Sequence, residues 1–468
     1  CYDGKIYYSM KNWYRLTSIF SFTKSSNYME DMMGVKSSSN DFKKVKMNLF
    51  DIIKLGCIFL HKLIHIEKLS DEFESKFNEI VKPYYGHKIC GPRNELIALF
   101  NEIAEVMVPL FTTPIINDVA VMIHFGSLKE SVNKLKVENK AEILNAAISS
   151  NGQVKSVGSA KELVKIHTYI RNDKDLKEDF ENLNVDELFD KYHHEGNSLF
   201  PFIQEYILNY GSRVVNELKL ETITMIENPK MIYEFLKSDI VGDYEDEAKS
   251  NIKLPKSIKR KAKKAQKFIK NRERLRLKRT YIFSVVRNIF ISLGEELAKE
   301  GIINDARDVF YLTKQEVFNI DESVDYKALV IQRKQEEKEN EIKPYYDRVV
   351  FYKDAVLPVM SSSGSSLSGI GNGYCYTGRI QVMNSYNDEL IPGSIILTKR
   401  TDPGWISLFP KAGGIIVEHG SMLSHSFVVA REMKVPAVVG VSNATGVLKD
   451  GDMVAIDGVK GEIRIESK

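Results

Sequence analysis

Apolar residues recur with the spacing of amphipathic helices along most of the chain, from about residue 41 to residue 345. Two stretches illustrate the pattern, with apolar residues at Phe50, Ile53, Leu55, Ile58, Leu60 and Leu63, and then at Leu96, Leu99, Phe100, Ile103, Val106 and Met107. We interpret these stripes as core rather than as chemistry. The pattern predicts a large, mostly helical domain, which we place at residues 1–345.

The pattern changes after residue 366, where short apolar runs alternate with turns. We predict strands at residues 379–383, 394–397, 414–417, 438–441, 453–456 and 462–465. A helix is expected directly after residue 425. The fold class is therefore multidomain, α and α/β, with a compact β/β/α domain at residues 367–468 after the helical domain.

Two segments of unusual composition separate these domains. Residues 332–341 are highly charged and poor in apolar residues, which fits an exposed helix or a hinge. Residues 361–366 read Ser-Ser-Ser-Gly-Ser-Ser, which is typical of a flexible tract. We expect residues 346–366 to be a linker that lets the last domain move.

The composition is that of a globular protein, with 43% hydrophobic residues, 28% charged residues and a net charge of +3. A chain of 468 residues is too long for one ordinary core, so two or three domains are expected. The near balance of charge gives no overall attraction to nucleic acid or to an anionic membrane. The scattered cysteines, the lack of a secretory signal and the lack of an apolar run of about 18 residues predict a cytoplasmic protein.

The densest charge lies at residues 253–279, which hold fourteen Lys or Arg and a single acid, Glu273. Such a density suits a nucleic-acid surface. The stretch continues without a break into the amphipathic residues 281–297, so we favour a long helix with a solvated basic face. A third interpretation is that part of the stretch faces a catalytic pocket.

His425 lies at a position that suits a phosphate-binding role. Residues 420–425 read Gly-Ser-Met-Leu-Ser-His and lie between the apolar run 414–417 and the amphipathic run 427–433. This order places His425 at a strand-to-helix turn, where free backbone N–H groups and the helix dipole favour negative charge. A lone histidine at such a turn is most often a cap or a space filler, but this position also suits a phosphate carried on a ring nitrogen.

The surroundings of His425 resemble a known family. Residues 413–432 read GGIIVEHGSMLSHSFVVARE, residues 435–440 read VPAVVG, and residues 401–405 read TDPGW. These strings resemble the swivelling phosphohistidine domain of the phosphoenolpyruvate synthase and pyruvate phosphate dikinase superfamily. The resemblance covers about residues 365–468, and one departure is Phe427, where the family more often has alanine.

The resemblance implies that His425 carries the phosphate. It also implies that the hydroxyls of Ser421 and Ser424, together with the backbone amides after His425, hold the phosphate oxygens. Thr401 and Asp402 are candidates to fix the tautomer of the imidazole, although a plain Asp-Pro-Gly turn explains these two residues equally well.

The length of chain after His425 limits the kind of enzyme that the resemblance implies. Members that use phosphoenolpyruvate or pyruvate carry a barrel of about 250 residues after the histidine domain, whereas only 43 residues follow His425 here. We therefore expect the acceptor to bind in the helical domain. This order is similar to that of rifampicin phosphotransferase, phenylphosphate synthase and the glutamine kinase of capsule phosphoramidate biosynthesis.

The resemblance extends, with less specificity, into the helical region. Residues 210–218 read YGSRVVNEL, residues 272–276 read RERLR, and residues 308–317 read DVFYLTKQEV. Arginines suit a place where a phosphoryl group is transferred, because one guanidinium neutralises two oxygens at once. Arg213, Arg272 and Arg276 are thus candidate phosphate ligands, and Glu217 is a candidate to orient an arginine or bind the acceptor. An ordinary surface Arg–Glu pair is the alternative.

The families of this resemblance bind ATP and Mg²⁺ in an ATP-grasp domain that precedes the helical part. This sequence has no Gly-rich phosphate loop followed by a strand-borne lysine and a carboxylate pair, and we predict no metal ligands in it. We expect one of two arrangements. Either the ATP-grasp domain belongs to the same polypeptide and has been removed from this sequence, or it is a separate polypeptide that acts in trans. The start at Cys1 rather than at methionine favours removal.

Together these implications predict a phosphotransferase that works through a histidine relay. The imidazole of His425 attacks the β-phosphorus of ATP, AMP leaves, and the pyrophosphorylated histidine loses one phosphate to water. The domain then swings to the helical domain, where an acceptor takes the remaining phosphoryl group. The predicted acceptor is the amide nitrogen of L-glutamine, and an antibiotic or phenolic hydroxyl is the alternative. A non-catalytic phosphocarrier subunit and a nucleic-acid-binding protein are the hypotheses from other classes; we expect neither a nucleic-acid nor a membrane partner.

Overall fold

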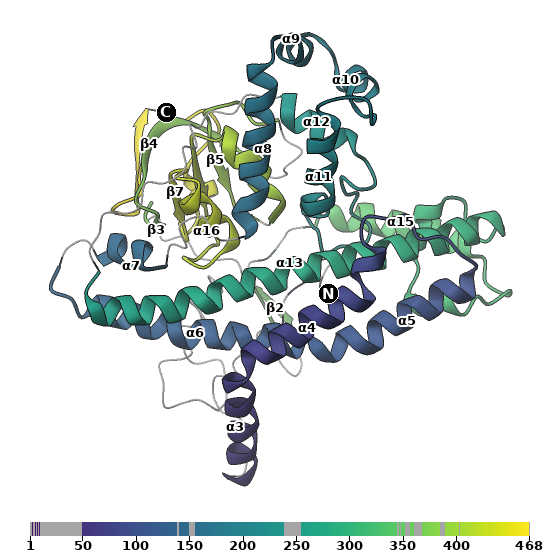
Figure 1. Cartoon of the computed structure of the whole chain (residues 1–468), viewed down its shortest axis with the longest axis horizontal. Coiled ribbons are helices and arrows are strands. Elements are labelled where there is room, and N and C mark those ends of the chain that lie inside the picture. Colours follow the sequence, from purple (N-terminus) through teal and green to yellow (C-terminus); the bar gives the residue numbers. More distant parts are fainter. Residues whose placement is uncertain are drawn as a thin grey trace.

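A computed structural model describes residues 2, 5, 7, 9, 49–137, 140–148, 155–237, 254–343, 346, 348–351, 356–359, 367–383, 389–401 and 403–467. Helices fill the described part of the chain up to residue 341, and a sheet dominates the part after residue 367. The predicted fold class is confirmed, and Figure 1 shows the two kinds of structure side by side.

One helix of 44 residues, α13 (Lys256–Lys299), is the spine of the helical domain. At about 1.5 Å per residue it is roughly 66 Å long. It lies beside α6 (Thr112–Asn133) in Figure 1. The other members of this bundle are α3 (Leu49–Ile64), α4 (Ile66–Ile80), η1 (Lys82–Tyr84), α5 (Arg93–Leu110), α7 (Lys140–Ile148), η2 (Ala306–Tyr311), α14 (Lys314–Phe318) and α15 (Tyr326–Glu341). The basic stretch is therefore part of a long helix, as we favoured.

A second group of helices stands beside the sheet-containing domain (Figure 1). It consists of α8 (Lys155–Asn172), α9 (Lys174–Asn182), α10 (Val185–Tyr192), α11 (Phe200–Tyr210) and α12 (Lys230–Lys237). Side-chain caps fix two of its helix starts: Asp173 accepts from the amides of Asp175 and Leu176, and Asn184 forms a capping box with Glu187. These helices enclose a hydrophobic core of their own.

The structure corrects the expectation that no apolar run is long enough to span a membrane. Helices α5 and α6 together give one candidate, Arg93–Asn133, with a mean hydropathy of 1.7 in its most apolar window. Within the protein, 44% of that window is buried, and α6 packs against α13. The core helix of a helical domain has the same composition, so this candidate is weak support for a membrane span.

The C-terminal domain is built on a seven-stranded mixed sheet with the order β3-β7-β6-β5-β4-β8-β9. Its elements are β3 (Ile370–Gly371), β4 (Cys375–Val382), β5 (Ile395–Thr398), η3 (Pro403–Lys411), β6 (Gly414–Val417), α16 (His425–Glu432), β7 (Ala437–Val439), α17 (Ala444–Val447), β8 (Met453–Asp457) and β9 (Glu462–Ser467). All six predicted strands are present. The short strand β3 was not predicted, because two residues give no periodicity.

Strands β4, β5, β6 and β7 run parallel, and α16 connects β6 to β7. Every residue of β5, β6 and β7 is buried, whereas β4, which also pairs with the antiparallel β8, is mostly exposed or half-buried. Between the two domains, β1 (Arg348–Phe351) and β2 (Val356–Val359) form an antiparallel hairpin that the composition did not predict. The serine-rich residues 361–366 lie outside the described residues.

The C-terminal domain is docked on the helical domain through a shared hydrophobic core. This core contains residues of both domains, among them Val119, Ile269, Trp405, Leu423 and Val428. The backbones also approach closely, because a Cβ on Gly404 would lie 2.1 Å from the amide nitrogen of Val215. The structure therefore shows the predicted histidine helix seated against the helical domain.

Candidate functional site

The site begins at the N-terminus of α16, whose first residue is His425. The chain reaches it from the carboxyl end of the parallel strand β6, the edge at which α/β sheets bind ligands. The side chain of His425 lies outside the described residues, as does the whole of Asp402. The backbone confirms the predicted strand-to-helix turn, and the role of His425 as phosphate carrier stays a prediction.

Both predicted serines lie on the turn that enters α16. Ser424 is the N-cap, but its hydroxyl donates to the carbonyl of Ser421 at 2.8 Å and makes no side-chain cap. The buried hydroxyl of Ser421 accepts from the amide of Leu423 at 3.3 Å. Because no side chain caps the helix, its first-turn amides are oriented to receive an anion.

Thr401 contacts the same first turn from a different loop. Its hydroxyl hydrogen-bonds the hydroxyl of Ser426, the residue next to His425. Thr401 therefore lies beside the first turn of the histidine helix. A contact of Thr401 with the imidazole itself stays a prediction.

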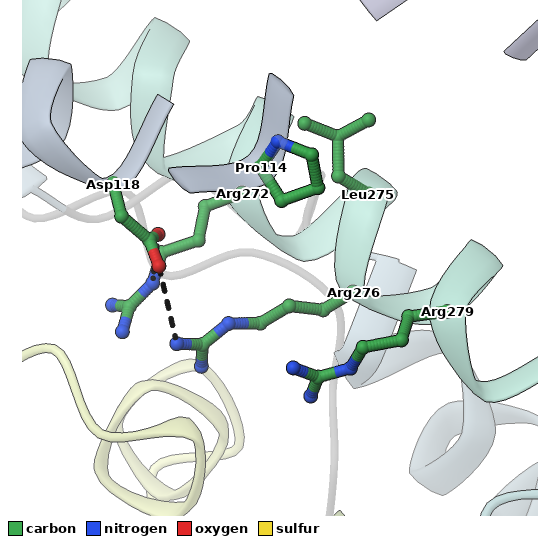
Figure 2. Close-up of a pocket in the computed structure, with 6 residues that line it drawn as sticks. All are labelled: Pro114, Asp118, Arg272, Leu275, Arg276 and Arg279. Atoms are coloured by element: carbon green, nitrogen blue, oxygen red, sulfur yellow. Dashed lines mark ion pairs between the residues drawn. The ribbon is translucent and has the colours of Figure 1, made fainter. Parts of the chain in front are cut away.

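Across the domain boundary, α13 presents three arginines, Arg272, Arg276 and Arg279. Their spacing of four and three residues puts them on one face of the helix, and Figure 2 shows their guanidinium groups on the same side of α13. They line a cavity of about 30 Å³ together with Pro114, Asp118 and Leu275. A cavity of this size has room for about one water molecule while the domains are docked.

Arg272 connects the two domains directly. Its Nη1 donates to the carbonyl oxygen of Leu423 at 3.0 Å, two residues before His425. Its Nε lies 3.0 Å from Oδ1 of Asp118 on α6. The arginine is only 7% exposed, so both contacts form away from bulk solvent. The spine of the helical domain therefore holds the histidine loop through a predicted phosphate ligand.

The cavity has more positive than negative charge. Asp118 is also 4.0 Å from Nη2 of Arg276, whereas Arg279 makes no ion pair with any residue in the described part of the chain. Burial, together with the charges of Arg276 and Arg279, lowers the pKa of Arg272 to about 10. Burial and the charge of Arg276 lower the pKa of Arg279 as well. All three arginines remain cations at neutral pH, which leaves an excess of two positive charges beside one carboxylate.

Comparisons with known proteins agree with this geometry. Residues 390–461 match the family described as the PEP-utilising enzyme, mobile domain. Residues 114–291, which contain Asp118 and the three arginines, match the family described as the rifampicin phosphotransferase fourth domain. All the residues that line the cavity fall in this second match, whereas Leu423, which accepts the hydrogen bond from Arg272, falls in the first.

Curated relatives point to the same group. A rifampicin phosphotransferase of Bacillus cereus is 30% identical over 42% of this chain and 24% of its own length, and one of Bacillus subtilis is 26% identical over 56% of this chain and 34% of its own length. A probable phosphoenolpyruvate synthase of Staphylothermus marinus is 44% identical over 16% of this chain and 9% of its own length. The chain belongs to the superfamily of PEP-utilising enzymes. It spans about a quarter to a third of the two rifampicin phosphotransferases.

In this member of the superfamily, Arg213 and Glu217 form a buried pair next to the mobile domain. Nε of Arg213 lies 3.7 Å from Oε2 of Glu217, and the two side chains are 3% and 5% exposed. The hydroxyl of Thr280 donates to Oε1 of Glu217 at 2.9 Å. Nε of Arg213 and Oε2 of Glu217 have no hydrogen-bond partner among the described residues. The alternative of an ordinary surface pair is therefore wrong.

Arg287 supports this pair from behind. It is fully buried, and its guanidinium donates to the carbonyl oxygens of Glu217, Lys219 and Leu220 at 3.0, 2.7 and 3.0 Å. It therefore clamps the loop that carries Glu217. By contrast, Asp308 of the third quoted block pairs with Lys334 and closes a capping box at η2, which is a structural role.

Sequence reasoning missed Asp118, Arg279 and Arg287. Asp118 is the one charged residue of the apolar run 106–123, and that isolation was a usable signal. Arg279 continues the face of Arg272 and Arg276 by one turn, which the family-like string 272–276 did not include. No group of three or more His, Cys, Asp or Glu side chains in the described part of the chain could hold a metal ion.

Proposed function

We propose that this chain is the acceptor-side part of a phosphotransferase that works through a phosphohistidine. In this proposal His425 presents the phosphoryl group to the guanidinium groups of Arg272, Arg276 and Arg279, and an acceptor in the helical domain takes it. The observation that carries the proposal is the bond from Arg272 to the carbonyl of Leu423, since it places an excess of arginine charge beside the histidine turn.

The transfer step follows from these groups. The bond between phosphorus and the ring nitrogen of His425 breaks as the bond between phosphorus and the acceptor atom forms. Arg276 and Arg279 neutralise the equatorial phosphoryl oxygens, while Arg272 holds the histidine loop in place. We assign the proton that the acceptor atom loses to Glu217, a buried carboxylate 3.7 Å from Arg213, from which it passes to solvent.

ATP and Mg²⁺ enter the proposal as the source of the phosphoryl group. The described residues offer no carboxylate cluster for Mg²⁺, so we assign the loading of His425 to an ATP-grasp part, in cis or in trans. The steps above begin from the loaded histidine. We place the reaction in the cytoplasm, with no nucleic-acid or membrane partner.

We propose the amide nitrogen of L-glutamine as the acceptor. The groups that converge beside the histidine turn are charged rather than apolar, and the buried pair of Arg213 and Glu217 leaves one polar atom of each sign without a hydrogen bond. An amino acid carries the complementary carboxylate and ammonium groups. A hydroxyl acceptor of the rifampicin phosphotransferase type is the second candidate, supported by the match of residues 114–291.

The competing classes fit the structure less well. A passive phosphocarrier has no use for three arginines that converge beside the histidine loop. A nucleic-acid surface requires free basic side chains, whereas Lys267 pairs with Glu67, Lys261 bonds Ser131, and Arg272 turns inward. The part of the basic stretch that reaches the cavity supports the interpretation of a catalytic pocket.

The proposal is tested by loading His425 chemically with potassium phosphoramidate and then adding amino acids and hydroxyl compounds one at a time. ³¹P NMR should show the signal of phosphorylated His425 replaced by a P–N or P–O product, and His425→Asn, whose other histidines also react with phosphoramidate, should give no such product. In the protein completed with its ATP-grasp part, ATP should yield AMP and inorganic phosphate. ADP as the nucleotide product, or an unchanged product yield in His425→Asn, would contradict the relay.

A further inference from the structure

We propose that Asp118 is a counter-ion that lowers the affinity of Arg272, Arg276 and Arg279 for phosphate. In this way it controls the rate at which the mobile domain is released after transfer. The inference rests on the proposed function, because it assigns a regulatory group to the same cavity. It concerns a residue on α6 that precedes the three arginines by more than 150 positions.

The position of Asp118 in the sequence is the first observation. It is the sole charged side chain in the run 106–123, which is otherwise apolar apart from Thr112, Thr113 and Asn117. Its side chain is 20% exposed, so it lies at the edge of the core, where partial desolvation of a carboxylate is offset by partners of opposite charge. Those partners are the arginines of α13.

Neighbouring polar groups fix where this carboxylate lies. The side chain of Asn117 donates to the carbonyl of Phe268 at 3.1 Å, and Asn271 donates to Asn117 at 2.9 Å and to Ser70 at 2.8 Å. These bonds set the register of α6 against α13. Because this register is fixed, Asp118 lies opposite Arg272 and Arg276.

The two contacts of Asp118 differ in kind. Its Oδ1 lies 3.0 Å from Nε of Arg272 in an ion pair without a hydrogen bond, and Arg272 is held further by its hydrogen bond to Leu423. Its Oδ2 is 4.0 Å from Arg276, which is too long for a hydrogen bond. Figure 2 shows the carboxylate between these two guanidinium groups. Arg272 is thus fixed, while Arg276 is held only by charge and can turn to a phosphoryl group.

The charge count explains the effect on affinity. Three arginines and one aspartate leave an excess of two positive charges, which matches a phosphoryl dianion. Without the carboxylate the excess is three, and the docked, phosphorylated state becomes too stable. A mobile domain must leave after each transfer, so a site that bound phosphate as tightly as three free arginines would slow the cycle.

The test compares Asp118→Asn with wild type by measuring the dissociation constant of inorganic phosphate in titration calorimetry. The amide keeps the acceptor oxygen for Arg272 and removes the charge, so we expect phosphate to bind about tenfold more tightly. Transfer turnover should fall as release becomes limiting, with the amplitude of the first turnover unchanged. Asp118→Glu, which keeps the charge, should bind phosphate within about threefold of wild type.

Asp71→Asn is the matched control, because Asp71 pairs with Arg274 of the same helix at 3.5 Å on the outer face. It should leave both quantities unchanged. Asp118→Ser is a second neutral variant in case the amide variant does not fold. Phosphate binding by neutral variants that is equal to or weaker than wild type would overturn the role of Asp118. Failure of the proposed function would look different, since His425→Asn would then transfer phosphate normally.

Discussion

The sharpest mutational prediction concerns Arg272, because this side chain contacts Asp118 in the helical domain and Leu423 in the mobile domain. Arg272→Ala removes the 3.0 Å bond to the carbonyl of Leu423 and the 3.0 Å contact with Asp118. A buried hydrogen bond from a charged donor contributes about 1.5–3 kcal/mol. At about 1.4 kcal/mol for each factor of ten, the docked state should lose about 10- to 100-fold in population relative to the undocked state.

The same change should slow transfer. Arg272 holds the histidine loop beside Arg276 and Arg279, so the rate of transfer should follow the population of the docked state. We therefore expect transfer from phosphorylated His425 to fall by about 10- to 100-fold in Arg272→Ala. Loading of His425 should stay within about threefold of wild type, because it does not use the docked cavity.

Rapid quench of protein carrying ³²P on His425 measures both steps, since loading appears as acid-labile protein phosphate and transfer as its loss to acceptor. Arg274→Ala is the matched control: Arg274 sits on the same helix but pairs outward with Asp71 and Glu74. It should retain normal transfer. Normal transfer by Arg272→Ala, or an equal loss of loading and transfer, would refute the assigned role.

Three further predictions concern the surroundings of the site. Arg287→Met leaves the carbonyls of the 217–220 loop without their buried donor. The free energy of unfolding, measured by urea denaturation, should therefore drop by about 3 kcal/mol or more. A loss below about 1 kcal/mol would contradict the role of Arg287 in holding this loop. Gly404→Ala would place a Cβ 2.1 Å from the amide nitrogen of Val215, so the mobile domain should dock poorly. Transfer should fall more than about tenfold, with the loading of His425 unchanged. A transfer rate equal to that of wild type would show that the two backbones are not in contact during transfer. Burial lowers the pKa of Lys411 to about 8, so unfolding takes up a proton between about pH 8 and about pH 10.5. The free energy of unfolding should therefore rise with pH across that window. Lys411→Met should lack this rise, and an identical pH slope in the variant would refute the prediction.

Much of the fold could be predicted because its patterns are local. Strands β5, β6 and β7 are short, nearly continuous apolar runs, and the histidine turn combines glycine, serine and a following amphipathic helix. The candidate residues Arg213 and Glu217 could be found because they stand four apart in one short string. Each of these features is contained within a few turns of chain.

The assembly of the site could not be predicted from such patterns. The bond between Arg272 and Leu423 joins residues 151 positions apart, and no local periodicity specifies it. Asp118 escaped notice because an apolar helix is assigned to the core as a whole. Its function emerges only when the register of α6 against α13 brings its carboxylate to two arginines.

The most direct test of the whole account is mass spectrometry of phosphopeptides under neutral conditions, before and after addition of acceptor. The account predicts one phosphoryl group on the peptide containing His425, lost in acid, absent from His425→Asn, and removed when acceptor is added to wild type. Phosphate on a different residue, or phosphate on His425 that no acceptor removes while product still forms, would contradict it.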